Sequence, residues 1–219
     1  MADRVTGLFP EADRARIQAA VEAAESRTSG EIVPYIVGRS DDYEEAEWRA
    51  GALAAILTLG GVGAYLWLSD SWLPFDTFLI SLDFSVAFLA GFLLARFVPG
   101  VKRVLAGRTL LERRVSARAT EAFLSEEVFA TSGRTGILLF VSILEHRVVV
   151  LGDTGINAKV KKEEWEAVVQ TVVGGIKGGR PADGIVSAIG QAGVLLERTG
   201  VRRSADDRDE LPDAPRIKG

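Results

Sequence analysis

Residues 135–152 read TGILLFVSILEHRVVVLG, and this stretch decides the fold of the chain around it. Residues 135–144 form an almost uninterrupted apolar run, which is typical of a strand buried on both faces. Residues 146–152 are rich in β-branched valine and follow after a short polar turn. The two segments predict an antiparallel strand pair inside a sheet.

Working outward from this pair, residues 31–37, EIVPYIV, predict another strand. We expect it at a sheet edge, because Pro34 has no N–H to donate to a neighbouring strand. The long connection between the two strand regions predicts that this strand runs parallel to residues 135–144. Four segments with apolar residues at helical spacing surround the strands: 10–27, 101–130, 165–176 and 185–196. The sequence therefore predicts an α/β fold with a small mixed sheet flanked by helices.

Two long apolar runs interrupt this α/β pattern. They cover about 50–68 and 77–95, and only the polar segment SDSWLPFD at 69–76 separates them. A helix of about 20 apolar residues spans the hydrocarbon core of a bilayer, which is roughly 30 Å thick. The runs therefore predict a transmembrane helical hairpin, with the lipid bilayer as a partner.

The predicted organisation has four parts. Residues 1–48 are the first part of a cytoplasmic α/β domain, 49–97 are the transmembrane hairpin, and 98–200 are the second part of the same domain. Residues 201–219, VRRSADDRDELPDAPRIKG, are polar and predict a disordered tail.

Basic residues around the hairpin predict its orientation. The loop between the runs has no Lys or Arg, whereas basic residues flank the outer ends of both runs: Arg49, Arg96, Lys102, Arg103 and Arg108. Because basic loops stay in the cytoplasm, we expect both termini and the α/β domain to be cytoplasmic. Aromatic rings favour the headgroup region, and Trp48 lies at the inner boundary while Trp67, Trp72 and Phe75 lie near the outer one.

Composition excludes some classes of function. Lys and Arg number 26 against 30 Asp and Glu, so the net charge of −4 does not favour nucleic acid as a partner. The chain has no cysteine, which excludes disulfides, thiol nucleophiles and cysteine metal sites.

Asp83 is a carboxylate inside the second apolar run. Together with Ala87, Gly91 and Ala95 it lies at four-residue spacing, which places a ridge of small residues along one helix face. Small residues allow close approach of another helix, and we expect the matching ridge of the first run to be Ala52, Gly60 and Ala64. We therefore predict that Asp83 faces the first helix, near Tyr65, and has a packing role; a role in ion or proton transfer is the alternative.

Asp153, Thr154 and Gly155 reproduce the tripeptide of aspartic proteases, but the chain has one copy of it and the segment that follows is helical in pattern. We interpret Asp153 and Thr154 as a turn or a helix cap after a strand. No combination of a nucleophile and a base can be assembled from the sequence.

Three segments resemble the TPM domain family. They are ADRARIQAAVEAAESRTSGEIVPYIV, TGILLFVSILEHRVVVLGDTGINAKV and GRPADGIVSAIGQAG, and the resemblance is strongest to the bacterial membrane branch in which a helix pair interrupts the domain. The family is associated with photosystem repair, with a proposed thylakoid acid phosphatase and with receptor accessory subunits. The resemblance implies a mixed sheet between helices and a location in the bacterial inner (plasma) membrane.

The resemblance also implies functions. The first is a non-enzymatic interaction domain that assists the assembly, protection or repair of another membrane protein, with a homo-oligomer as a further option. The second is a phosphatase dependent on Ca²⁺ or Mg²⁺, for which Glu31 and Asp153 are the candidate ligands because hard cations bind carboxylate oxygens. We favour the first function; a third alternative, an accessory subunit of a transporter or channel, rests on Asp83 itself.

Overall fold

The computed structural model describes residues 7–69, 77–201 and 210–218. The chain divides into two compact units. One combines Met1–Ser40 with Glu112–Gly219, and we call it the α/β unit; the other is Asp41–Leu111, the hairpin unit. The hairpin unit is wider than the range 49–97 expected from the apolar runs, because it also contains a short helix after the second run.

The α/β unit is built on a mixed sheet of four strands with the order β3-β2-β1-β4. β1 pairs in parallel with β2 and with β4, whereas β2 and β3 are antiparallel. The predicted α/β class, the parallel pair and the antiparallel pair are therefore confirmed. The strands are β1 Glu31–Val37, β2 Gly136–Ser142, β3 Arg147–Gly152 and β4 Arg216–Lys218.

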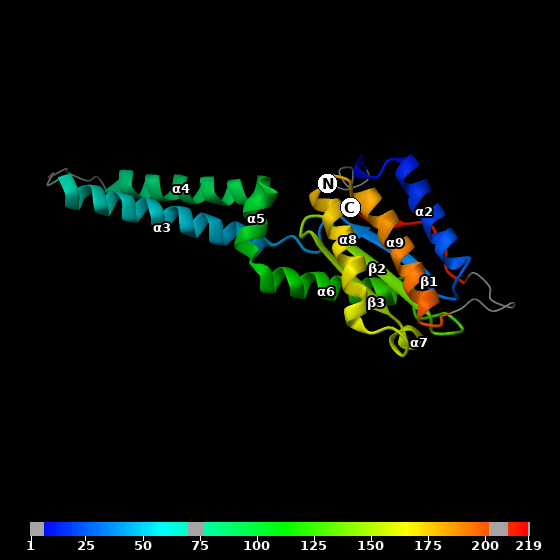
Figure 1. The fold of residues 1–219 in the computed structure, drawn as a ribbon. Coiled ribbons are helices and arrows are strands. Elements are labelled where there is room, and N and C mark those ends of the chain that lie inside the picture. The colour runs from blue at the N-terminus through cyan, green and yellow to red at the C-terminus, as the bar shows by residue number, and fades with distance from the viewer. Residues whose placement is uncertain (1–6, 70–76, 202–209, 219) are drawn as a thin grey trace. The chain divides into compact units, whose positions relative to one another are not determined.

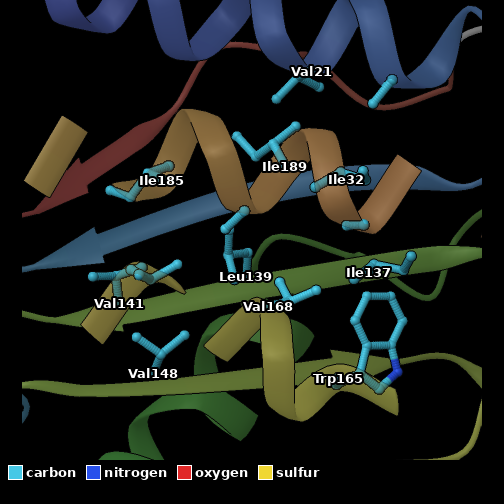
Figure 2. Close-up of a cluster of buried hydrophobic side chains, with 14 of the residues drawn as sticks. Val21, Ile32, Ile137, Leu139, Val141, Val148, Trp165, Val168, Ile185 and Ile189 are labelled. Carbon is cyan, nitrogen blue, oxygen red and sulfur yellow. The ribbon is translucent and has the colours of Figure 1, made fainter. Parts of the chain in front are cut away.

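One face of the sheet carries the larger of two apolar clusters. Helices α2 (Glu11–Glu25), α8 (Glu166–Lys177) and α9 (Pro181–Arg198) cover this face (Figure 1). Val21 of α2 and Ile189 of α9 lie in this cluster, and Val168 of α8 lies near Leu139 of β2 (Figure 2). These side chains are at most 2% exposed, so this face is a closed core.

The opposite face packs against α6 (Arg108–Ser125). Val115 and Ala119 of α6 lie in the same apolar cluster as Tyr35 of β1 and Phe140 of β2. The rings of Tyr35 and Phe140 stack with centroids 5.7 Å apart. Because β1 and β2 are covered on both faces, every residue of the two strands is buried, as the apolar run at 135–144 predicts.

The single helix predicted over 101–130 is wrong. The structure has two helices there, α5 (Pro99–Ala106) and α6, with Gly107 between them at φ +80°. This backbone conformation is accessible to glycine at little cost, so Gly107 separates two segments that share one helical sequence pattern.

The prediction of a disordered tail from residue 201 is also wrong for the residues that the structure describes. Val201 is buried in the large cluster, and Arg216–Lys218 form β4 beside β1. β4 covers only Tyr35–Val37 of β1, so the rest of the outer edge of β1 has no strand beside it among the described residues. β1 is thus neither a full edge strand nor a fully paired one.

The hairpin unit contains α3 (Glu44–Ser69), α4 (Thr77–Phe97) and α5. α3 and α4 lie side by side, and α5 packs at one end of the pair (Figure 1). By length and composition both long helices can cross a membrane. Their large apolar side chains are mostly exposed, as at Leu57 (74%), Leu68 (75%) and Phe78 (68%).

Polar contacts fix α5 to the hairpin. Glu47 accepts a hydrogen bond from Nζ of Lys102 at 2.5 Å, and Nη1 of Arg96 lies 3.4 Å from the same carboxylate. Nη1 of Arg49 donates to the carbonyls of Leu105 at 3.0 Å and of the next residue at 3.3 Å. A buried acid therefore neutralises Lys102 and part of the charge of Arg96, two of the basic residues that flank the apolar runs.

Candidate functional site

Carboxyl groups gather where β1 begins. Glu25 is the last residue of α2, and its side chain is buried although it is ionisable (8% exposed). Its Oε1 accepts a hydrogen bond from the backbone N–H of Ile32 at 2.6 Å. Asp213 of the C-terminal segment shares a hydrogen bond with Glu25, and Glu31 lies close enough to act on it electrostatically. We call Glu25, Glu31 and Asp213 the carboxyl cluster.

The carboxyl cluster holds a proton at neutral pH. Burial raises the pKa of Glu25 from an ordinary 4.5 to about 9, and the negative charges of Glu31 and Asp213 add to this effect. The hydrogen bond from Ile32 acts in the opposite direction but is the smaller effect. The neutral carboxyl group of Glu25 can therefore donate to Asp213 while it accepts from Ile32.

Glu31 and Asp153, the predicted metal ligands, lie at the same end of the sheet but on different strands. Glu31 begins β1, Asp153 follows the last residue of β3, and both flank Gly136 at the start of β2. Adjacent strands are about 4.8 Å apart, so two strand spacings separate their backbones. Among the described ranges 7–69, 77–201 and 210–218, no group of three acidic or histidine side chains has an arrangement that holds a metal ion.

Asp153 has a structural role that the sequence analysis predicts. It is the N-cap of α7 (Thr154–Asn157), where Oδ1 accepts from the N–H of Thr154 at 2.7 Å. The guanidinium of Arg134 lies across its carboxylate, with Nε 2.7 Å from Oδ2 and Nη2 3.1 Å from Oδ1. Because one cation and one backbone donor already engage these oxygens, Asp153 is poorly placed to share an ion with Glu31.

A second polar network lies at the other end of β1 and β2. The hydroxyl groups of Ser40 and Ser142 are 2.8 Å apart, and Ser142 donates to the carboxylate of Glu145. The same carboxylate accepts from the backbone N–H of Ser40 at 2.8 Å. Ser142 is fully buried, so the network joins the segment after β1 to the β2–β3 turn and serves as a structural tie.

The predicted packing ridge of the hairpin is right for part of α4 and wrong for α3. Gly91 and Ala95 are buried, and Ala87 is half-buried. A Cβ atom on Gly91 would lie 2.5 Å from the carbonyl oxygen of Ala50 and 2.7 Å from Cβ of Ala54. The α3 face that meets α4 therefore includes Ala50 and Ala54. The residues predicted for it are exposed: Ala52, Gly60 and Ala64.

The position predicted for Asp83 is also wrong. Asp83 and Tyr65 are both exposed, so Asp83 does not lie buried against α3 as its four-residue spacing from Gly91 suggests. The helices approach closely at Gly91, nearer the other end of α4. Trp48 packs there against Phe88 and Phe92, with ring centroids 5.8 and 5.6 Å apart. Trp72 and Phe75 fall outside the described residues.

A comparison of two substitutions tests this account of the hairpin. We expect Gly91→Leu to weaken α3–α4 packing by about 2 kcal/mol, because its side chain must displace the backbone of Ala50. Asp83→Leu should leave the packing unchanged and, in the membrane-spanning hairpin that the sequence predicts, improve insertion by about 2 kcal/mol, since charged residues within a bilayer are costly. Disulfide cross-linking between cysteines introduced into α3 and α4 measures the first effect, and the fraction of chain that resists carbonate extraction measures the second.

Loss of cellular function on Asp83→Leu, with normal packing and abundance, would contradict a purely structural view of Asp83. That result would favour ion or proton transfer.

Neither Glu25 nor Asp213 is among the site residues predicted from the sequence. Glu25 lies on the buried face of a predicted helix, one turn after Val21. An acidic residue on that face is a sequence signal for a buried carboxyl group. Asp213 gave no signal, because it lies in a polar segment without periodicity.

Comparison with known proteins supports the fold. No protein-family model matches the chain, and no curated protein matches it. Among solved structures, it is similar to the NMR structure of the BA42 protein from the psychrophilic bacterium Bizionia argentinensis, with a TM-score of 0.58. The match covers 95% of this chain and 94% of that one at 20% sequence identity. At this identity the similarity concerns the fold alone.

Proposed function

We propose that this chain is a membrane-anchored, TPM-like interaction domain that assists the assembly, protection or repair of another membrane protein. The observation that carries the proposal is the hairpin of α3 and α4, whose apolar side chains are mostly exposed. Exposed apolar surface of this extent needs lipid or protein to cover it. The hairpin leaves the α/β unit after β1 and returns before β2, so both parts of the sheet belong to one anchored domain.

The plasma membrane, with both termini in the cytoplasm, is the proposed location. Lys and Arg flank the outer ends of the apolar runs and are absent from the loop between them, which supports this orientation. The alternative of a metal-dependent phosphatase requires Glu31 and Asp153 to share Ca²⁺ or Mg²⁺, and the pairing of Asp153 with Arg134 disfavours it. The alternative of a transporter accessory subunit rests on Asp83 and is tested by Asp83→Leu.

The absence of cysteine from the sequence makes a topology measurement direct, because single cysteines can be introduced without removing native ones. We expect Ser71→Cys, between the apolar runs, to react with a membrane-impermeant maleimide on intact bacterial cells. Gln18→Cys in α2 and Glu197→Cys in α9, both exposed, should react only after lysis. Labelling of Gln18→Cys on intact cells would show that the proposed orientation is wrong.

The interaction itself is tested by affinity capture of the full chain from detergent-solubilised membranes. We expect a defined membrane protein to copurify in constant ratio with the chain. The matched control combines Leu57→Arg with Leu89→Arg, two exposed hairpin positions whose change to arginine disfavours insertion. Capture of nothing beyond the control's background would count against an interaction domain.

A further inference from the structure

Residues 210–218 lie against the outer edge of β1 in the manner of a bound peptide. β4 pairs with Tyr35–Val37, and the N–H of Gly38 donates to the carbonyl of Lys218 at 3.3 Å. The N–H groups of residues 32, 34, 36 and 38 share one edge, because strand residues alternate. Ile32 donates to Glu25 on this edge, and Pro34 has no donor. Along this edge, only the N–H groups of residues 36 and 38 are therefore left to pair with another strand.

Side chains at the end of this segment meet one acidic residue. Glu126, which follows α6, accepts from Nε of Arg216 at 3.2 Å, and Nζ of Lys218 lies 3.8 Å from its other oxygen. The side chain of Arg216 is only 12% exposed, and it also donates to the carbonyls of Pro212 and Ala214. This contact selects a basic residue at the position of Arg216.

The beginning of the segment is also recognised. Glu210 accepts from the backbone N–H of Ser132 at 2.9 Å, and its own N–H lies 3.4 Å from Oε1 of Glu31. Asp213 bonds to Glu25 in the carboxyl cluster. Leu211 packs against the apolar cluster on one face of the sheet and Ile217 against the cluster on the other. The residues of this segment that make contacts therefore follow the order acid, apolar, acid, basic, apolar, basic along 210–218.

These contacts are specific, but few of them are strong. β4 has three residues, fewer than a typical strand, so few backbone hydrogen bonds hold it. Leu211 and Ile217 are only partly buried. The segment is also covalently tethered to α9, which gives it a local concentration on the order of millimolar. An untethered segment with the same pattern can compete when its affinity or its concentration is sufficient.

We propose that the outer edge of β1, with Glu126, Ser132 and Glu25, is a peptide-binding site for an extended segment of a partner protein. Residues 210–218 occupy this site in the resting chain. The partner segment carries a basic, an apolar and a second basic residue, preceded by an acidic one, and adds to the sheet as a strand. This inference rests on the proposed interaction function and assigns a site to it.

The test uses the full chain in detergent and a fluorescent peptide with the sequence of residues 209–219. Fluorescence anisotropy should show weak binding to the unmodified chain, whose own segment fills the site. The variant Arg216→Glu with Ile217→Asp weakens the tethered segment and leaves the site intact, so it should bind the peptide at least about tenfold more tightly. Adding Glu126→Arg to that variant should remove this gain.

Charge reversal provides the control for folding. A peptide with glutamate at the positions of Arg216 and Lys218 should bind the chain that carries Glu126→Arg, which the original peptide does not. No gain in the weakened variant, or binding independent of residue 126, would overturn the site. If the peptide experiment fails but a partner is still captured from membranes, the proposed function stands without this site. If the peptide binds but no partner is captured, the proposed function fails and the site remains.

Discussion

The Gly136→Ala substitution is expected to lower the midpoint of thermal unfolding of the α/β unit by about 6–12 °C. Gly136 begins β2, and a Cβ atom there would overlap the carbonyl oxygen of Val128. Backbone has to move to admit the methyl group, which corresponds to about 3 kcal/mol at the upper end of overpacking effects. Circular dichroism of the full chain in detergent measures the midpoint, and hydrogen exchange of the β1 and β2 amides locates the loss.

The matched control is Gly174→Ala in α8. A Cβ atom at Gly174 meets nothing within 4 Å, so alanine should stabilise the helix by up to about 1 kcal/mol. Equal midpoints for the two variants would refute the close approach of Val128 to Gly136.

The Glu25→Gln substitution should stabilise the α/β unit at alkaline pH and have little effect at acid pH. The folded chain keeps a proton on Glu25 up to a pKa of about 9, whereas the unfolded chain releases it near 4.5. The stability that the protonated group provides is complete below the lower value and is lost as pH rises toward the higher one. Glutamine retains both hydrogen bonds without a proton to lose, so the gain should reach about 4 kcal/mol at pH 8.

The measurement is the midpoint of thermal unfolding of both chains from pH 5 to pH 9. Glu31 and Asp213, the other acids of the carboxyl cluster, are present in both, so the difference between the two curves reports Glu25. Glu22→Gln on the exposed face of α2 should follow the unmodified chain throughout. Parallel curves for Glu25→Gln and the unmodified chain would mean that Glu25 has an ordinary pKa.

The sequence predicts the central strands well because burial on both faces requires continuous apolar residues. β1 agrees with the predicted range 31–37, and β2 and β3 lie within the ranges predicted for them. β4 could not be predicted, since Arg-Ile-Lys has no pattern and its position depends on Glu126, distant in sequence. A short strand held by side-chain charges gives no local signal.

The hairpin shows a different limit. Its two apolar runs predict the helices because length and composition are sufficient for that purpose. Which face of α3 meets α4 could not be predicted reliably, because an almost wholly apolar helix has little contrast between faces. Spacing alone selected Ala52, Gly60 and Ala64, whereas the actual approach is set by Gly91 against Ala50 and Ala54.

The parallel pairing of β1 with β2 has a consequence for biosynthesis. Glu31 pairs with Gly136, and both apolar helices are translated between them. β1, whose residues are all buried in the finished sheet, therefore leaves the ribosome well before its central partner exists. During that interval the nascent chain exposes an unpaired apolar strand, which is prone to aggregation. Both apolar helices are therefore synthesised before the sheet can close, and any delay in their synthesis prolongs the exposure of residues 31–37.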